Sequence, residues 1–138
     1  MAAGTLAERG FDVTLADKNE KTGKKLYITG KGRCNVTNEC DGKEFLASVV
    51  SNPKFLMSAI NAFDSYDTVD FLQKNGLNTV TERGNRVFPA SQKSSDVIKT
   101  FTDYCRKNGG QYHFLCFVFE LIHITSCCCF CLEYSAIM

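Results

Sequence analysis

The stretch AAGTLAERGFDVTLAD (residues 2–17) decides the fold class of this chain. Its first half is rich in small, helix-favouring residues and stops at Gly10, which suits the positive φ of a helix C-terminal turn. Residues 11–16 then alternate apolar and polar side chains, the period-two pattern of a strand, and Asp17 closes that strand. The order helix, glycine, strand, acid predicts an α/β fold.

Asp17 has the position of a nucleotide-binding acid. In a dinucleotide-binding (Rossmann) unit, a carboxylate at the end of the second strand binds a ribose hydroxyl about 20 residues after a glycine-rich turn. Counting back that far passes Met1, so we expect the first strand and its Gly-x-Gly-x-x-Gly turn to precede this chain. An ordinary strand-end acid is the alternative, and Asp17 alone does not decide between them.

Helices are expected over 43–75 and 94–108, with short strands near 11–16 and 77–89. The helical region contains two start signals, Asn52-Pro53 and then Asp64 or Ser65. Residues 82–85 form a turn between the later strands, and Ser94 or Ser95 begins the last helix. Residues 19–40, which are rich in glycine and basic side chains, are expected to form an ordered loop.

The segment TGKGRCN (residues 29–35) is the sharpest chemical feature. Two glycines let backbone amides approach an anion, and Lys31 and Arg33 add positive charge, so the segment can cradle a phosphate. It does not match the Walker pattern, and a solvated basic turn is the alternative. Cys34 is either a thiolate activated by its basic neighbours or a small packing residue.

Composition limits the classes of partner. The 138 residues fit one domain, and a formal net charge of +1 gives no global attraction for nucleic acid or an anionic membrane. No secretory signal is visible, so a reducing cytoplasm is expected to keep the cysteines free.

The domain is expected to span 1–110, and residues 111–138 form an apolar, cysteine-rich tail foreign to it. Glu120 and His123 argue against a membrane span within this tail, because charged and polar groups are costly there. Cys127, Cys128, Cys129 and Cys131 lack paired Cys-x-x-Cys spacing, so no metal site is expected. Self-association through the tail stays open.

Four motifs together resemble one family: Asp17-Lys18-Asn19, Gly23-Lys24-Lys25-Leu26, residues 29–38 and Arg86-Val87-Phe88-Pro89-Ala90-Ser91. It is the aminoacetone-oxidase-like group of FAD-dependent, or NAD(P)/FAD-dependent, oxidoreductase flavoproteins, which includes a bile-acid-intermediate reductase. The resemblance implies a two-dinucleotide-binding-domain fold, of which this chain would be an incomplete Rossmann-like FAD-binding fragment. It further implies electron or hydride transfer through bound FAD, with NAD(P)H as one electron donor.

The resemblance also assigns cofactor contacts. Asp17 would take the adenosine ribose and Lys18 the adenine side. The remaining contacts would wrap FAD toward its isoalloxazine end: Lys24, Lys25, Thr29, Gly30, Lys31, Gly32, Arg33, Cys34 and Asn35. The Phe88-Pro89-x-Ser91 loop would be structural or flavin-adjacent. Neither the substrate nor a catalytic acid or base is identified, and a non-catalytic fragment or a small interaction module that does not bind FAD remains the alternative.

Overall fold

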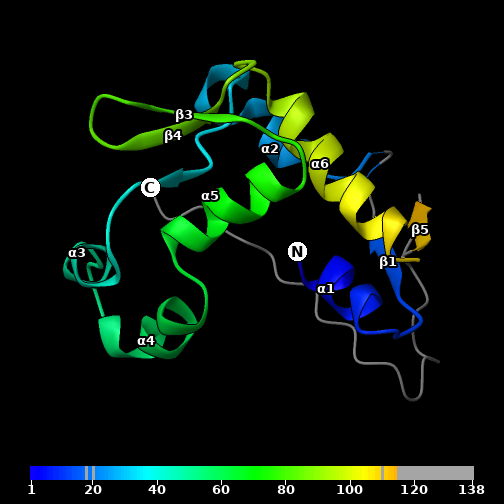
Figure 1. Cartoon of the computed structure of the whole chain (residues 1–138), viewed down its shortest axis with the longest axis horizontal. Coiled ribbons are helices and arrows are strands. Elements are labelled where there is room, and N and C mark those ends of the chain that lie inside the picture. Colours follow the sequence, from blue (N-terminus) through cyan, green and yellow to red (C-terminus); the bar gives the residue numbers. More distant parts are fainter. Residues whose placement is uncertain (18, 20, 110, 115–138) are drawn as a thin grey trace.

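A computed structural model describes residues 1–17, 19, 21–109 and 111–114 (Figure 1). The chain is a mixed α/β structure. In order along the chain the elements are α1 (Ala2–Glu8), β1 (Thr14–Asp17), α2 (Lys24–Ile28), η1 (Thr29–Gly32), β2 (Thr37–Asn38), α3 (Gly42–Ala47), α4 (Pro53–Ala62), α5 (Ser65–Lys74), β3 (Thr79–Glu82), β4 (Arg86–Pro89), α6 (Ser94–Lys107) and β5 (Gln111–Phe114).

Two small sheets organise these elements. β1 and β5 pair in parallel, with Thr14 opposite Gln111 and Asp17 opposite Phe114. The other sheet is antiparallel in the order β2-β4-β3. Parallel strands need a long crossover between them, and here the crossover includes α6, which leads directly into β5. Among the described residues, the second edge of β1 pairs with no strand.

The predicted helices and strands are confirmed, with two corrections. The region 43–75 contains α3, α4 and α5, while β3 and β4 form the expected hairpin. The loop expected over 19–40 is wrong in part, because it contains α2, η1 and β2. The segment Gln111–Phe114, which the sequence assigned to the foreign tail, forms β5; residues 115–138, including the cysteine cluster, lie outside the described part of the chain.

The helix start signals differ in how they work. Asp64 caps α5 in a capping box, accepting from the Asp67 backbone N–H while the Asp67 carboxylate accepts from that of Asp64, both at 2.9 Å. Asn52 precedes Pro53 at the start of α4, but it is left-handed (φ 48°) and its side chain makes no capping hydrogen bond. The predicted boundary is therefore right, while side-chain capping by Asn52 is wrong.

The core lies where α5 and α6 meet the antiparallel sheet. Cys34, Leu72, Leu77 and Val97 form a buried cluster, and Phe71 and Phe101 are among the half-buried side chains packed against it. α1 packs on α6 through Gly4, since a Cβ there would come within 2.5 Å of the Tyr104 ring. None of the helices in the described residues is both long and apolar enough to cross a membrane.

Candidate functional site

Asp17 lies at the carboxyl end of β1, as the sequence predicts. Its side chain is half-buried, and Oδ1 accepts hydrogen bonds from both the backbone N–H and the Nδ2 of Asn19, each at 2.9 Å. These bonds hold the carboxylate beside the strand end, the edge at which open α/β sheets bind ligands. Lys18, predicted beside it, lies outside the described residues.

Helix α2 connects Asp17 to the glycine-rich segment. It rests on the first half of α6, where a Cβ at Gly23 would lie 3.0 Å from Ile98 Cγ1 and Ser94 Oγ donates to the Tyr27 carbonyl at 3.3 Å. Lys24 and Lys25 are exposed on this helix. Both therefore present their ammonium groups to solvent.

The segment 29–35 has a strained backbone. Gly30, Lys31, Gly32 and Cys34 all have φ between 55° and 86°, and left-handed non-glycine residues persist only where surrounding structure holds them. A Cβ at Gly30 would lie 3.0 Å from the Asn35 backbone nitrogen and 3.3 Å from Phe88 Cε1. The glycine at position 30 is therefore required by internal packing, whereas the nearest atom to a Cβ at Gly32 would be 3.9 Å away.

Arg33 is bound to residues far away in sequence. Its Nη1 donates to Glu82 Oε1 and to Gln92 Oε1, both at 2.8 Å. The guanidinium carbon also lies 4.1 Å from the centre of the Phe88 ring, a cation–π contact. Neither Glu82 nor Gln92 was predicted from the sequence, because both partners are remote and carry no local motif.

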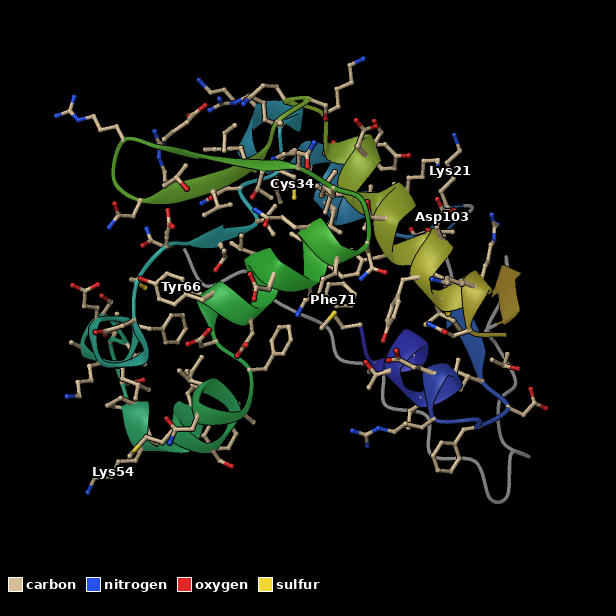
Figure 2. All side chains as sticks on the ribbon, viewed as in Figure 1. Lys21, Cys34, Lys54, Tyr66, Phe71 and Asp103 are labelled. Atoms are coloured by element: carbon tan, nitrogen blue, oxygen red, sulfur yellow. The ribbon has the colours of Figure 1, made fainter. Side chains whose placement is uncertain are left out.

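Cys34 is a packing residue. Only 1% of it is exposed, and it lies in the core against residues of α5 and α6 (Figure 2). Burial raises the pKa of its thiol, and a hydrogen bond with the Thr29 side chain only partly opposes that rise. The shift is opposite in direction to that of a reactive thiolate, so the packing alternative holds.

Thr29 and Asn35 hold the two ends of this segment. Thr29 Oγ1 donates to the Leu26 carbonyl at 2.9 Å. The Asn35 amide nitrogen, oriented to satisfy its neighbours, donates to the carbonyls of Thr37 and Val87 at 3.1 Å each. The segment is thus fixed to α2 on one side and to β4 on the other.

Positive charge remains available at the surface of this site. Lys24, Lys25 and Lys31 are exposed and form no ion pair with any described residue. A carboxylate at a strand end and these free ammonium groups are suited to ribose hydroxyls and phosphates, so the residues present fit the adenosine and phosphate parts of FAD. Within the described range no three acidic, histidine or cysteine side chains gather as a metal site.

A separate hollow of about 270 Å³ lies at the carboxyl ends of α5 and α6. Its lining includes Glu8, Phe71 and Tyr104, and the Tyr104 hydroxyl donates to Glu8 Oε2 at 2.7 Å. None of the predicted site residues lines it. The cofactor prediction therefore rests on the strand end and the glycine-rich segment, and the hollow contributes nothing to it.

Comparison with known proteins identifies a matching family and several relatives. A family model described as the HI0933-like protein Rossmann domain matches residues 1–127. The ribosomal RNA dihydrouridine synthase of Escherichia coli is 30% identical over 100 residues, covering 72% of this chain and 24% of that protein. The 3-dehydro-bile acid delta(4,6)-reductase of Clostridium scindens is 31% identical over 97 residues, covering 70% of this chain and 23% of the reductase.

The ribosomal RNA dihydrouridine synthase of Haemophilus influenzae is 26% identical over 110 residues, covering 79% of this chain and 26% of that protein. The chain thus spans about a quarter of the length of these curated relatives.

Proposed function

The chain belongs to the HI0933-like Rossmann-domain family, and from this premise we propose that it supplies part of the FAD-binding domain of an oxidoreductase. The observation that carries the proposal is the position of Asp17, at the carboxyl end of a parallel strand and followed by the cation-bearing segment that ends at Asn35. Such strand ends are where doubly wound sheets bind nucleotides.

The residue roles follow the order of the chain. Asp17 accepts hydrogen bonds from the adenosine ribose, with Lys18 at the adenine side. Lys24, Lys25 and the segment Thr29–Asn35, apart from the buried Cys34 side chain, extend along the cofactor toward the flavin ring. When bound, FAD supplies the hydride or electron transfer, and the protein groups orient the cofactor and balance its charge.

We propose a reaction class from the relatives' names. Dihydrouridine is uridine with its ring carbon–carbon double bond reduced, and a 3-dehydro delta(4,6) bile acid carries double bonds conjugated to a carbonyl. Both names describe reduction of a carbon–carbon double bond conjugated to a carbonyl group. The complete protein is proposed to catalyse this class of reduction with NAD(P)H as electron donor, within the aminoacetone-oxidase-like group.

Two kinds of substrate fit this class. A small molecule is favoured by the net charge of +1, which argues against a large nucleic-acid surface. Ribosomal RNA is favoured by the names of two relatives and by the exposed lysines of the site. Affinity for an RNA oligonucleotide that falls steeply with added salt would select RNA, since phosphate contacts release counterions.

The cellular setting is also proposed. Cys34, Cys40 and Cys105 are free in the described part of the chain, which agrees with the reducing cytoplasm expected from the sequence. A fragment that does not bind FAD is the competing proposal, and cofactor binding separates the two.

The test uses FAD titrations followed by flavin fluorescence. The unpaired edge of β1 suggests one addition, a strand and a Gly-x-Gly-x-x-Gly turn joined ahead of Met1, and we expect this longer protein to bind FAD far more tightly than the chain alone. Asp17→Ala should then weaken binding about tenfold, the loss expected for one hydrogen bond to a charged group.

Asp12→Ala is the matched control, because Asp12 is an exposed acid ahead of the same strand. Its affinity for FAD should stay at the unmutated value. Equal affinities for the Asp17 and Asp12 variants would remove the ribose role of Asp17, and no binding by the longer protein would favour the inert fragment.

A further inference from the structure

The guanidinium of Arg33 is held on one edge and over one face. Both hydrogens of Nη1 are used, one by Glu82 Oε1 and one by Gln92 Oε1. The guanidinium carbon lies over the ring of Phe88, 4.1 Å from its centre, and Phe88 is itself only 2% exposed. These partners lie 49 to 59 positions along the chain from Arg33, on the hairpin and just after it.

The opposite edge of the same group is free to bind. A guanidinium has five N–H donors, and Nε and Nη2 together form a two-pronged edge that matches an oxyanion. That edge makes no hydrogen bond to any described residue, and 38% of the Arg33 side chain is exposed. The Arg33 guanidinium is thus held in one orientation while its Nε–Nη2 edge stays available to a ligand.

We infer that Glu82 and Gln92 are positioning residues, which fix Arg33 so that its Nε–Nη2 edge is presented to a phosphate of a bound dinucleotide. The dinucleotide itself rests on the proposed function, whereas the orientation of Arg33 rests on the contacts above. A long arginine side chain loses rotamer freedom when it binds, and fixing it in advance removes that cost.

Glu82 also offsets the charge of Arg33, and this gives a distinctive signature. Removing the carboxylate while keeping an acceptor, as in Glu82→Gln, leaves the orientation and increases the positive charge. Removing the acceptor, as in Glu82→Ala, releases the guanidinium. If Glu82 only stabilised the fold, both variants would lose affinity for the phosphate ligand equally. If Glu82 positions Arg33, only Glu82→Ala should lose affinity.

The experiment uses two probes, inorganic pyrophosphate with the 138-residue chain and FAD with the longer protein of the FAD titrations. The Nε–H resonance of Arg33, assigned by its loss in Arg33→Lys, reports whether the guanidinium is ordered. We expect this resonance to be sharp in the unmutated chain and in Glu82→Gln, and broadened in Glu82→Ala and Gln92→Ala. Glu39→Ala is the matched control, because Glu39 accepts from Thr81 on the same hairpin and not from Arg33.

Pyrophosphate should shift the Arg33 resonance of the unmutated chain. Its affinity should fall about tenfold in Glu82→Ala, while in Glu82→Gln it should equal or exceed the original. An Arg33 resonance that stays sharp in both alanine variants, or that pyrophosphate fails to shift, overturns the inference. An equal loss of pyrophosphate affinity in Glu82→Gln and Glu82→Ala also overturns the inference.

FAD separates this inference from the proposed function. The FAD arm uses the longer protein with the added strand and Gly-x-Gly-x-x-Gly turn. If pyrophosphate shifts the Arg33 resonance with the expected pattern and the longer protein binds no FAD, the positioning role stands and the proposed function fails. If the longer protein binds FAD while the Arg33 resonance is unperturbed, cofactor binding stands and the positioning role is wrong.

Discussion

The glycine-rich segment with β4 and the helix pair α3–α4 both carry large apolar side chains, yet these differ in burial. On β4, Val87 is fully buried and Phe88 nearly so. On α4 no residue is buried, and Phe55 keeps 79% of its surface exposed. In Figure 1, α3 and α4 lie together at the end of the molecule away from α6.

This difference shows what an apolar pattern predicts and what it does not. Helical spacing predicts α4 correctly, because the pattern reports on local conformation. Burial also requires a partner surface, and among the described residues α4 packs chiefly on the short helix α3, through contacts such as Ile60 against Gly42. The segment around Arg33 has less regular secondary structure than α4, but its side chains contact distant residues such as Glu82 and Gln92.

The largest test of this comparison removes one ring from each region. Phe88→Ala should lower the free energy of unfolding by about 3–5 kcal/mol, because it leaves a cavity and removes the face that Arg33 packs against. Phe55→Ala should change it by about 0.5 kcal/mol or less, as expected for an exposed position. Urea denaturation followed by circular dichroism measures both, and similar losses in the two variants would show that α4 has a partner surface.

The next largest difference in stability is expected between alanine substitutions at two glycines, Gly30 and Gly42. Gly30→Ala should destabilise the fold by about 1–2 kcal/mol for its left-handed conformation alone, and the 3.0 Å approach to the Asn35 backbone nitrogen adds to that loss. Gly42 is the control: it lies in α3 without a left-handed φ, and Ile60 Cγ2, 3.2 Å from the added Cβ, would need to shift by only a few tenths of an ångström. Gly42→Ala should be nearly neutral, since alanine favours the helix, and an equal loss at both positions would contradict the strain argument.

The smallest expected effect is a pH dependence at Cys34. Burial raises the pKa of this thiol above its ordinary value of 9.0, so the folded chain keeps the proton where the unfolded chain loses it. The stability from the neutral thiol is full below pH 9.0 and is lost as the pH rises through the raised value.

Thermal unfolding between neutral and alkaline pH measures this effect. The loss of stability above pH 9 should be smaller in Cys34→Ala than in the unmutated chain. Cys40→Ala, which removes a half-buried thiol near α3, should leave the dependence as it was. If stability falls with rising pH as steeply in Cys34→Ala as in the unmutated chain, the buried thiol does not contribute to the pH dependence of stability.

Much of the fold could be predicted from the sequence because its signals are local. Alternation predicted β1, the turn before Arg86 predicted the hairpin, and Asp64 predicted the start of α5. α2 was missed because five residues are too few to show a helical period. β5 was missed because the segment after Gly110 changes composition, which hides a short strand.

The site could be predicted only in part. Asp17 was identified by its place after a strand, and the structure keeps it there. The contacts of Arg33 could not be predicted, because Glu82 and Gln92 approach it only after the chain folds back on itself. The two alternatives for Cys34 likewise depended on burial, a property that its charged sequence neighbours did not reveal.

The parallel pairing of β1 with β5 sets the order in which this chain can assemble during synthesis. About a hundred residues separate the two strands, so β1 leaves the ribosome long before its partner exists. The β3–β4 hairpin needs only a short turn and can form while α6 is still being translated. For most of its synthesis β1 therefore lacks its partner β5, and the edge that β5 will cover stays open to other contacts.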